Sequence, residues 1–173
     1  MKYIQLFIIS IFFWLPITSQ AFPIPDDSEV SFDVIRKNKI IGNLTTKFIT
    51  DKENIVLHSV LDINVKILFI PAYKFFQETK ETWSNGEFIS IDGFTDFEDD
   101  REYKIDGKDE DGVFRVTGMD GLLELDDKII PLNYWNKNIL KEKELFDTQK
   151  GIVRKITVKK LKEEEIKINN SKL

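Results

Sequence analysis

The sequence predicts a mainly β protein, with a single curved antiparallel sheet or an incomplete β-barrel and one short helical segment near 136–145. Apolar and polar residues alternate along most of the chain, and this period of two is typical of strands with one buried face. Turn-forming residues recur roughly every 8–12 positions, and no long segment has the helical period. Many short strands joined by tight turns favour an antiparallel sheet, either open or closed on itself.

The first half of the chain contains four predicted strands separated by polar turns. Gly42 and the imperfect alternation at 59–60 each indicate a β-bulge. Pro71 has no N–H to donate, so we expect no central strand position there. The pair Asn85 and Gly86 favours a type I′ hairpin turn. These four strands cover 28–36, 40–49, 55–65 and 74–83.

The second half of the chain contains shorter predicted strands, and glycines separate them. After Pro131 the residues up to 145 have room for one or two helical turns, and two more strands follow. The predicted strands cover 87–97, 101–105, 113–117, 122–125, 152–161 and 165–168, and the separating glycines are Gly107, Gly112, Gly118 and Gly121.

The first 21 residues have the layout of a secretory signal peptide. Lys2 precedes an apolar run over 3–15, and Ser19 and Ala21 are the small residues that a cleavage site needs. The run is shorter than the ~20 residues of a membrane-spanning helix, so an uncleaved anchor is the less favoured alternative. We therefore expect cleavage after Ala21, a single β domain over 22–173, and a periplasmic protein without a stable membrane span.

Composition narrows the classes of protein and partner. The chain has no cysteine, so an exported form has no disulfides and is not a lipoprotein. The net charge is −5, or −6 once Lys2 is removed. From residue 138 onward, ten Lys or Arg and six Asp or Glu give +4, which leaves −10 before it. The acidic body argues against a nucleic-acid partner, and the basic tail either contacts an anionic surface or is simply solvated.

No catalytic or metal-binding constellation is found. His58 is the single histidine, and it lacks the nucleophile and orienting acid of a catalytic base, so we expect a structural or surface role. The acidic run over 96–111 offers the oxygen ligands that calcium prefers, but its spacing does not fit a calcium-binding loop. Solvated hairpin tips explain the run better, and we expect neither a metal nor a cofactor.

An apolar patch over 67–73, extended by Phe75 and Phe76, is the clearest candidate for a binding surface. The concave face of a curved sheet can hold a lipid tail or another apolar ligand. Ordinary core packing is the alternative, since aromatic residues at strand spacing usually pack together. The candidate ligand-binding residues are Phe69, Tyr73, Phe75, Trp83, Tyr134 and Trp135.

Two alternatives to a binding protein are a hydrolase and a structural component of the cell envelope. A carboxylate-based hydrolase would use a pair of acids such as Glu78, Glu81 or Asp92, because two carboxylates at a suitable separation can hydrolyse glycosidic bonds. Acids at alternate strand positions usually lie on the solvated face, which makes the hydrolase the weaker interpretation.

Several blocks of sequence, taken in order, resemble a known family. They are the residues 32–42, the segment 65–73 leading to Glu-Thr-Trp-Ser-Asn-Gly at 81–86, Pro-Leu-Asn-Tyr-Trp-Asn at 131–136, and 145–151. Together they resemble exported bacterial proteins defined only as a domain of unknown function, akin to periplasmic domains that are similar to lipoprotein-carrier half-barrels. The resemblance spans roughly 28–161. It implies a curved antiparallel sheet in a Gram-negative periplasm, and it implies no catalytic residues.

The resemblance also implies that family members continue with further strands, whereas this chain ends at Leu173 in a Lys- and Asn-rich tail. Either the domain is shortened at its C terminus, or the sequence is partial, or a partner covers the sheet edge left open. We therefore expect a non-enzymatic binding protein. Its ligand would be an apolar molecule or lipid in the concave face, or a protein along the open C-terminal edge.

Overall fold

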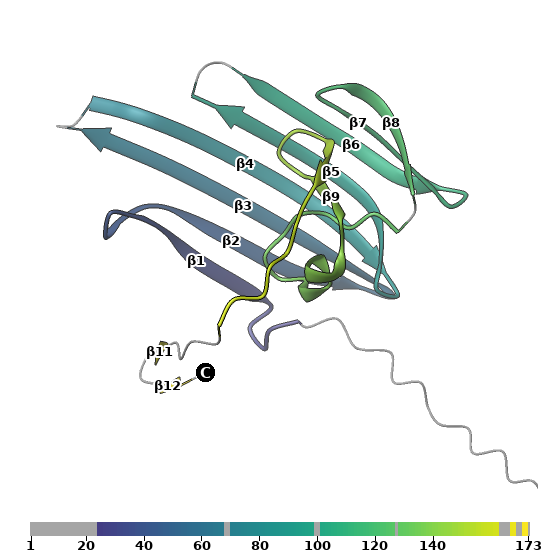
Figure 1. Cartoon of the computed structure of the whole chain (residues 1–173), viewed down its shortest axis with the longest axis horizontal. Coiled ribbons are helices and arrows are strands. Elements are labelled where there is room, and N and C mark those ends of the chain that lie inside the picture. The colour runs from purple at the N-terminus through teal and green to yellow at the C-terminus, as the bar shows by residue number, and fades with distance from the viewer. Residues whose placement is uncertain are drawn as a thin grey trace, which may run out of the picture.

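The computed structural model describes residues 24–67, 70–98, 101–126, 128–162, 167–168 and 171–172. Within them, an 8-stranded antiparallel sheet has the order β1-β2-β3-β4-β5-β6-β7-β8, so each strand pairs with its neighbours in sequence. The sheet is curved and open, with β1 and β8 at its edges, which confirms the predicted fold class (Figure 1). The strands are β1 (Glu29–Arg36), β2 (Lys39–Asp51), β3 (Asn54–Ile67), β4 (Ile70–Ser84), β5 (Glu87–Phe97), β6 (Glu102–Glu110), β7 (Val113–Gly118), β8 (Gly121–Asp126), β9 (Glu144–Asp147), β10 (Ile152–Lys155), β11 (Lys167–Ile168) and β12 (Ser171–Lys172), and the single described helix is the 3-10 turn η1 (Lys137–Lys141).

The residues after β8 cross back over one face of the sheet (Figure 1). Among them, β9 and β10 pair as a separate antiparallel hairpin, and Phe146 in β9 forms a parallel bridge with Pro131. We call residues 129–155 the cover, and the sheet face beneath it the covered face. The main sheet is therefore covered on one face only, and its other face carries no second layer within the described residues.

The period of two along each strand decides which side chains face the cover. In β4, alternate residues from Phe75 to Trp83 are buried, whereas Lys74 and Lys80 are exposed. Because successive side chains of a strand point to opposite faces, the buried set lies on the covered face. That set has an aromatic residue at each end and three polar residues between them, namely Gln77, Thr79 and Glu81.

The hydrophobic core lies between the cover and the sheet and extends from β2 to β7. Phe88 and Phe114 stack with ring centroids 4.7 Å apart, and Phe146 of the cover meets Phe114 edge-on at 6.2 Å. Phe114 and Phe146 are both 0% exposed. The buried cluster consists of Phe48, Leu57, Trp83, Phe88, Ile91, Ile105, Phe114, Val116 and Phe146.

Two glycines bring the backbone of the cover against the sheet. A Cβ atom on Gly151 would lie 2.6 Å from the Cα atom of Gly118, closer than side-chain atoms pack. Next to this contact, the Met119 N–H donates to the Lys150 carbonyl at 2.7 Å. The turn that joins β9 to β10 is thus fixed to the turn that joins β7 to β8.

The Asn85–Gly86 hairpin turn and the bulge beside Gly42 agree with the predictions from the sequence, whereas a second predicted bulge does not. Asn85 and Gly86 both have positive φ, of 51° and 86°, which fits the predicted type I′ turn. The register of β1 against β2 shifts beside Gly42, where a bulge is predicted. The bulge predicted at 59–60 is wrong, because the pairing of β3 is continuous there and shifts instead after Val65.

Several predicted element boundaries need correction. Pro71 lies inside β4, but opposite Lys66 near the strand's start, where β4 pairs with β3 and not yet with β5. Gly107 lies inside β6 rather than between strands, because its missing Cβ leaves room for Val116 of β7. The predicted helical segment over 136–145 is one 3-10 turn followed by strand β9.

The C-terminal strands are also shorter than predicted. The strand predicted over 152–161 ends at Lys155, where its partner β9 begins with Glu144. Of the strand predicted over 165–168, residues 165–166 lie outside the described residues, and β11 covers the other two.

Candidate ligand-binding site

A cavity of about 170 Å³ lies between the cover and the first four strands of the sheet. Its volume is similar to that of apolar protein cavities of about 150 Å³ that bind a benzene-sized molecule. Strands β1 to β4 form its floor, and two segments of the cover form its roof. The lining residues are Val30, Phe32, Leu44, Thr46, Phe48, Ser59, Leu61, Gln77, Thr79, Glu81, Leu132, Asn133, Tyr134, Trp135, Asp147, Thr148 and Gln149.

The cavity has a buried floor and an exposed apolar rim. Phe48, Thr79 and Glu81 on the floor are each almost fully buried. At the rim, Phe32 is 52% exposed and Tyr134 is 85% exposed. The cavity therefore opens to solvent between the edge strand β1 and the cover.

Polarity changes from one side of the cavity to the other. The lining residues from β1 are Val30 and Phe32, whereas β4 contributes only polar side chains. A molecule that fills the cavity would meet apolar groups at the mouth and hydrogen-bonding groups at the β4 wall. This arrangement suits an amphipathic ligand, since binding sites commonly combine apolar walls with a few placed polar groups.

Glu81 is the polar group at the centre of the β4 wall. It is 3% exposed, and its Oε2 atom accepts hydrogen bonds from Trp83 Nε1 at 3.1 Å and from Asn133 Nδ2 at 3.5 Å. Burial raises the pKa of Glu81 from 4.5 to about 7, and the hydrogen bonds from Trp83 and Asn133 oppose that rise. Near neutral pH the carboxyl group is therefore divided between its neutral and ionised forms.

The second oxygen of Glu81 is open to the cavity. Oε1 accepts no hydrogen bond from the described residues. Among the described residues, the one side-chain polar atom that is both inaccessible to solvent and without a hydrogen-bond partner is Thr95 Oγ1. Because Oε1 of Glu81 also has no partner, it must be accessible to solvent. Oε1 is thus available to a ligand, while Oε2 is held by the protein.

The other acid in the cavity, Asp147, is fully engaged by the protein. Its Oδ2 atom accepts from Arg154 Nε at 2.7 Å, and its Oδ1 atom accepts from the Gln149 N–H at 2.8 Å. Asp147 therefore holds the turn after β9 rather than facing a ligand with free acceptors. Glu81 has no comparable ion pair in the described residues.

Hydrogen bonds and rings attach the roof of the cavity to its floor. Gln77 Nε2 donates to the Thr148 carbonyl at 3.0 Å. Trp135 of the cover meets Trp83 and Phe48 edge-on, with ring centroids 5.2 and 6.3 Å away. Because both contacts reach from the cover to the sheet, they set the height of the cavity.

The structure places some of the predicted ligand-binding residues at the cavity and others away from it. Tyr134 and Trp135 line the cavity, and Trp83 lies directly beside it, holding Glu81. Phe75 instead packs edge-on against Phe97 at 5.0 Å, and Tyr73, which is 37% exposed, does not line the cavity. The remaining candidate, Phe69, lies outside the described residues.

The acids of the hydrolase hypothesis do not form one site. Glu81 lies on the covered face, whereas Glu78 and Asp92 occupy positions on the opposite face. Glu78 is instead the partner of His58, whose Nε2 atom is 2.6 Å from Glu78 Oε1 on the uncovered face. The three carboxylates are therefore not placed to act together on one bond.

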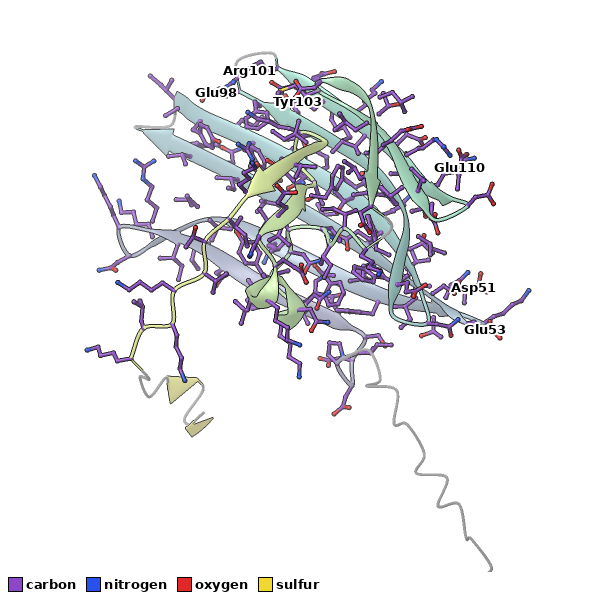
Figure 2. The ribbon with its side chains drawn as sticks, turned by 45° about the vertical axis from the view of Figure 1, so that its right-hand side comes forward. Asp51, Glu53, Glu98, Arg101, Tyr103 and Glu110 are labelled. Atoms are coloured by element: carbon purple, nitrogen blue, oxygen red, sulfur yellow. The ribbon has the colours of Figure 1, made fainter. Side chains whose placement is uncertain are left out.

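Part of the acidic run lies at the tip of the β6–β7 hairpin, whereas Asp106 lies within β6, opposite Asp92 of β5. Asp109 Oδ1 accepts from the Gly112 N–H at 3.0 Å, which makes it part of the β6–β7 hairpin tip. Figure 2 shows Glu110 at that tip, and Asp51 and Glu53 at the tip between β2 and β3. In the part of the chain that the structure describes, no group of three or more His, Cys, Asp or Glu side chains could hold a metal ion.

The polar lining residues Gln77, Thr79 and Asn133 are among those that the sequence did not single out. A signal for the first two was present, because they stand at even spacing between Phe75 and Trp83, whose bulk predicts a buried face. Asn133 directly precedes Tyr134 and Trp135, which are predicted to bind a ligand, but its own amide side chain carries no signal of that role.

Comparisons with known proteins place the chain in a family. None of the helices within the described residues is long and apolar enough to cross a membrane. Neither the search of curated proteins nor the search of solved structures gave a match. One family does match, over residues 32–173, and it confirms the resemblance to a domain of unknown function. The chain belongs to the family described as "Domain of unknown function (DUF6134)".

Proposed function

We propose that this protein is an exported, non-enzymatic binding protein that holds a small apolar or amphipathic ligand in the cavity under the cover. The observation that carries the proposal is the cavity itself, which has a buried floor, an apolar rim and one polar wall. Export rests on the signal-peptide layout of residues 1–21.

The exposed rim supports a ligand that is larger than the cavity. Phe32 and Tyr134 present large apolar surfaces at the mouth, together with Leu132. A chain end inside the cavity and a longer apolar part across the rim would cover these side chains. Burial of apolar area contributes about 25 cal/mol per Å², so both parts would add to affinity.

Native mass spectrometry of the purified protein tests the proposal. The full chain, including residues 1–21, is expressed in a Gram-negative host, recovered from the periplasm and extracted with organic solvent. We expect a polypeptide that begins at Phe22 and carries a stoichiometric small molecule. A protein without any bound molecule that also takes up no hydrophobic dye would refute the proposal. A stoichiometric protein partner would favour instead an interaction at the sheet edges.

Variants that fill the cavity locate the binding site. Leu61→Phe adds volume on the covered face of β3, and Val60→Phe adds the same kind of side chain on the opposite face of the same strand. We expect Leu61→Phe to lower dye or ligand uptake at least tenfold and Val60→Phe to leave it unchanged. Thr79→Leu fills the cavity from β4 and serves as a second variant if Leu61→Phe does not fold.

A further inference from the structure

The charges around the cavity are all of one sign. Its described lining includes two carboxylates, Glu81 and Asp147, and no Lys, Arg or His. Arg154 is hydrogen-bonded to the lining residue Asp147 and compensates that charge, whereas Glu81 has no such ion pair among the described residues. An anionic ligand would therefore meet an uncompensated carboxylate, since a buried like charge is strongly unfavourable.

Aromatic rings surround the same space. Phe32, Phe48, Tyr134 and Trp135 line the cavity, and the rings of Phe48 and Trp135 are fixed against each other at 6.3 Å. Aromatic faces attract organic cations through their quadrupoles, and sites for ammonium ligands use several such rings. The rings and the carboxylate thus favour the same kind of ligand.

The open Oε1 atom of Glu81 favours a ligand that donates a hydrogen bond to it. Oε2 of Glu81 already accepts from Trp83 and Asn133, while Oε1 is open to the cavity and has no partner among the described residues. An ammonium group carries N–H donors only, and a hydrogen bond between opposite charges is about twice as strong as a neutral one.

We propose that the ligand of this cavity is an organic ammonium compound, whose charged nitrogen pairs with Oε1 of Glu81 and whose short apolar body lies against Phe48, Trp135 and the rim. This inference rests on the proposed function and names its ligand class. The assignment rests on Glu81, a carboxylate that the fold buries and whose Oε1 atom accepts no hydrogen bond from the described residues.

The pairing couples binding to protons. The titratable side chains that line the cavity are Glu81, Asp147 and Tyr134, and Asp147 is already paired with Arg154. Because burial raises the pKa of Glu81 to about 7, part of the protein carries a proton there at neutral pH. An ammonium ligand stabilises the ionised form, so binding below pH 7 releases that proton to the buffer.

The test compares three ligands that differ only in their polar end. Hexylammonium, 1-hexanol and hexanoate are titrated into the protein that begins at Phe22, and binding is followed by calorimetry at pH 7.5. We expect hexylammonium to bind at least tenfold more tightly than 1-hexanol, and hexanoate to bind most weakly. Calorimetry at pH 6 in two buffers of different ionisation enthalpy should show proton release with hexylammonium alone.

The variant Glu81→Gln separates charge from shape. We expect it to weaken hexylammonium at least tenfold and to leave 1-hexanol within threefold, because a charged hydrogen bond is lost while the volume is kept. Glu78→Gln, which changes an acid on the uncovered face of the same strand, should alter neither. If Glu81→Gln does not fold, the wild-type protein still decides the matter, since its affinity for hexylammonium must rise from pH 5.5 to pH 8.

The outcomes distinguish this inference from the proposed function. Equal affinities for hexylammonium and 1-hexanol, or no change with pH, would overturn the ammonium assignment and leave a binding protein for neutral apolar ligands. If hexanoate bound most tightly, the sign of the assigned charge would be wrong. If none of the three bound, and the native protein carried no ligand, both proposals would fail.

Discussion

The two halves of the covered face belong to one sheet and lie under the same segment, yet one is filled and the other is hollow. Over β5 to β7, the cover packs directly on the sheet through Phe146, Phe114 and the close approach of Gly118 and Gly151. Over β1 to β4, it stands away from the sheet and leaves a cavity of about 170 Å³.

The difference lies in the residues that face the cover. The later strands present large apolar side chains and glycines, which allow close packing of side chains and of backbone. The earlier strands present Thr46, Ser59, Gln77, Thr79 and Glu81, which are polar and mostly smaller. A filled half therefore holds the cover in place, and the hollow half is left available for a ligand.

Removal of the main contact in the filled half should have the largest effect. Phe146→Ala leaves a void beside Phe114, and we expect a loss of about 3–5 kcal/mol in the free energy of unfolding. Urea denaturation followed by fluorescence measures it. Tyr134→Ala, in the roof of the hollow half, is the control and should change stability by less than about 0.5 kcal/mol because Tyr134 is mostly exposed. Similar losses in both variants would mean that the two halves do not differ in packing.

The hollow half should make stability depend on pH. The folded pKa of Glu81, about 7, lies above its ordinary value of 4.5. The folded state therefore binds more protons between these values, and stability falls as pH rises through that window. The shift corresponds to about 3 kcal/mol at about 1.4 kcal/mol per pKa unit. Denaturation between pH 4.5 and pH 8 should show this fall in the wild type and not in Glu81→Gln, and parallel profiles would contradict it.

The close backbone contact should have a smaller effect that can be isolated. Gly151 and Gly121 both have positive φ, but a Cβ atom meets the sheet backbone at Gly151 and nothing within 4 Å at Gly121. Gly151→Ala and Gly121→Ala therefore share the backbone strain and differ in the contact. We expect thermal unfolding to show an additional loss of roughly 1–3 kcal/mol for Gly151→Ala, as for other overpacked sites. Equal losses would show that the cover does not need this approach.

Most of the sheet could be predicted from local sequence, because hairpins are local structures. The pair Asn85 and Gly86 fixes its turn by its own backbone preferences, and alternation fixes which residues of β4 share a face. The bulge after Val65 could not be placed, since it depends on how β3 pairs with β4 rather than on β3 alone.

The candidate site was less accessible to prediction, because it joins residues far apart in the chain. Trp135 was a candidate from its aromatic character, but its contact with Trp83 depends on the cover's path. The sequence favours a solvated position for Glu81, because acids at alternate strand positions usually lie on the solvated face and both faces of β4 are polar in its middle. Phe75 and Trp83 indicate which face is buried, but the position of the cover is needed to show that the polar residues between them are buried too.

The path of the cover also has a consequence for the order of folding. Gln77 and its partner Thr148 are 71 positions apart, whereas each hairpin of the sheet joins strands next to each other in sequence. Local pairings form before distant ones, because a long loop loses more entropy on closure. We expect the eight-stranded sheet to form first, while the face that the cover later buries is still exposed to solvent. The protein should aggregate readily at that stage. The cover, which is synthesised after the strands that it shields, would then act as an internal chaperone, since it shields a surface that its own chain had exposed.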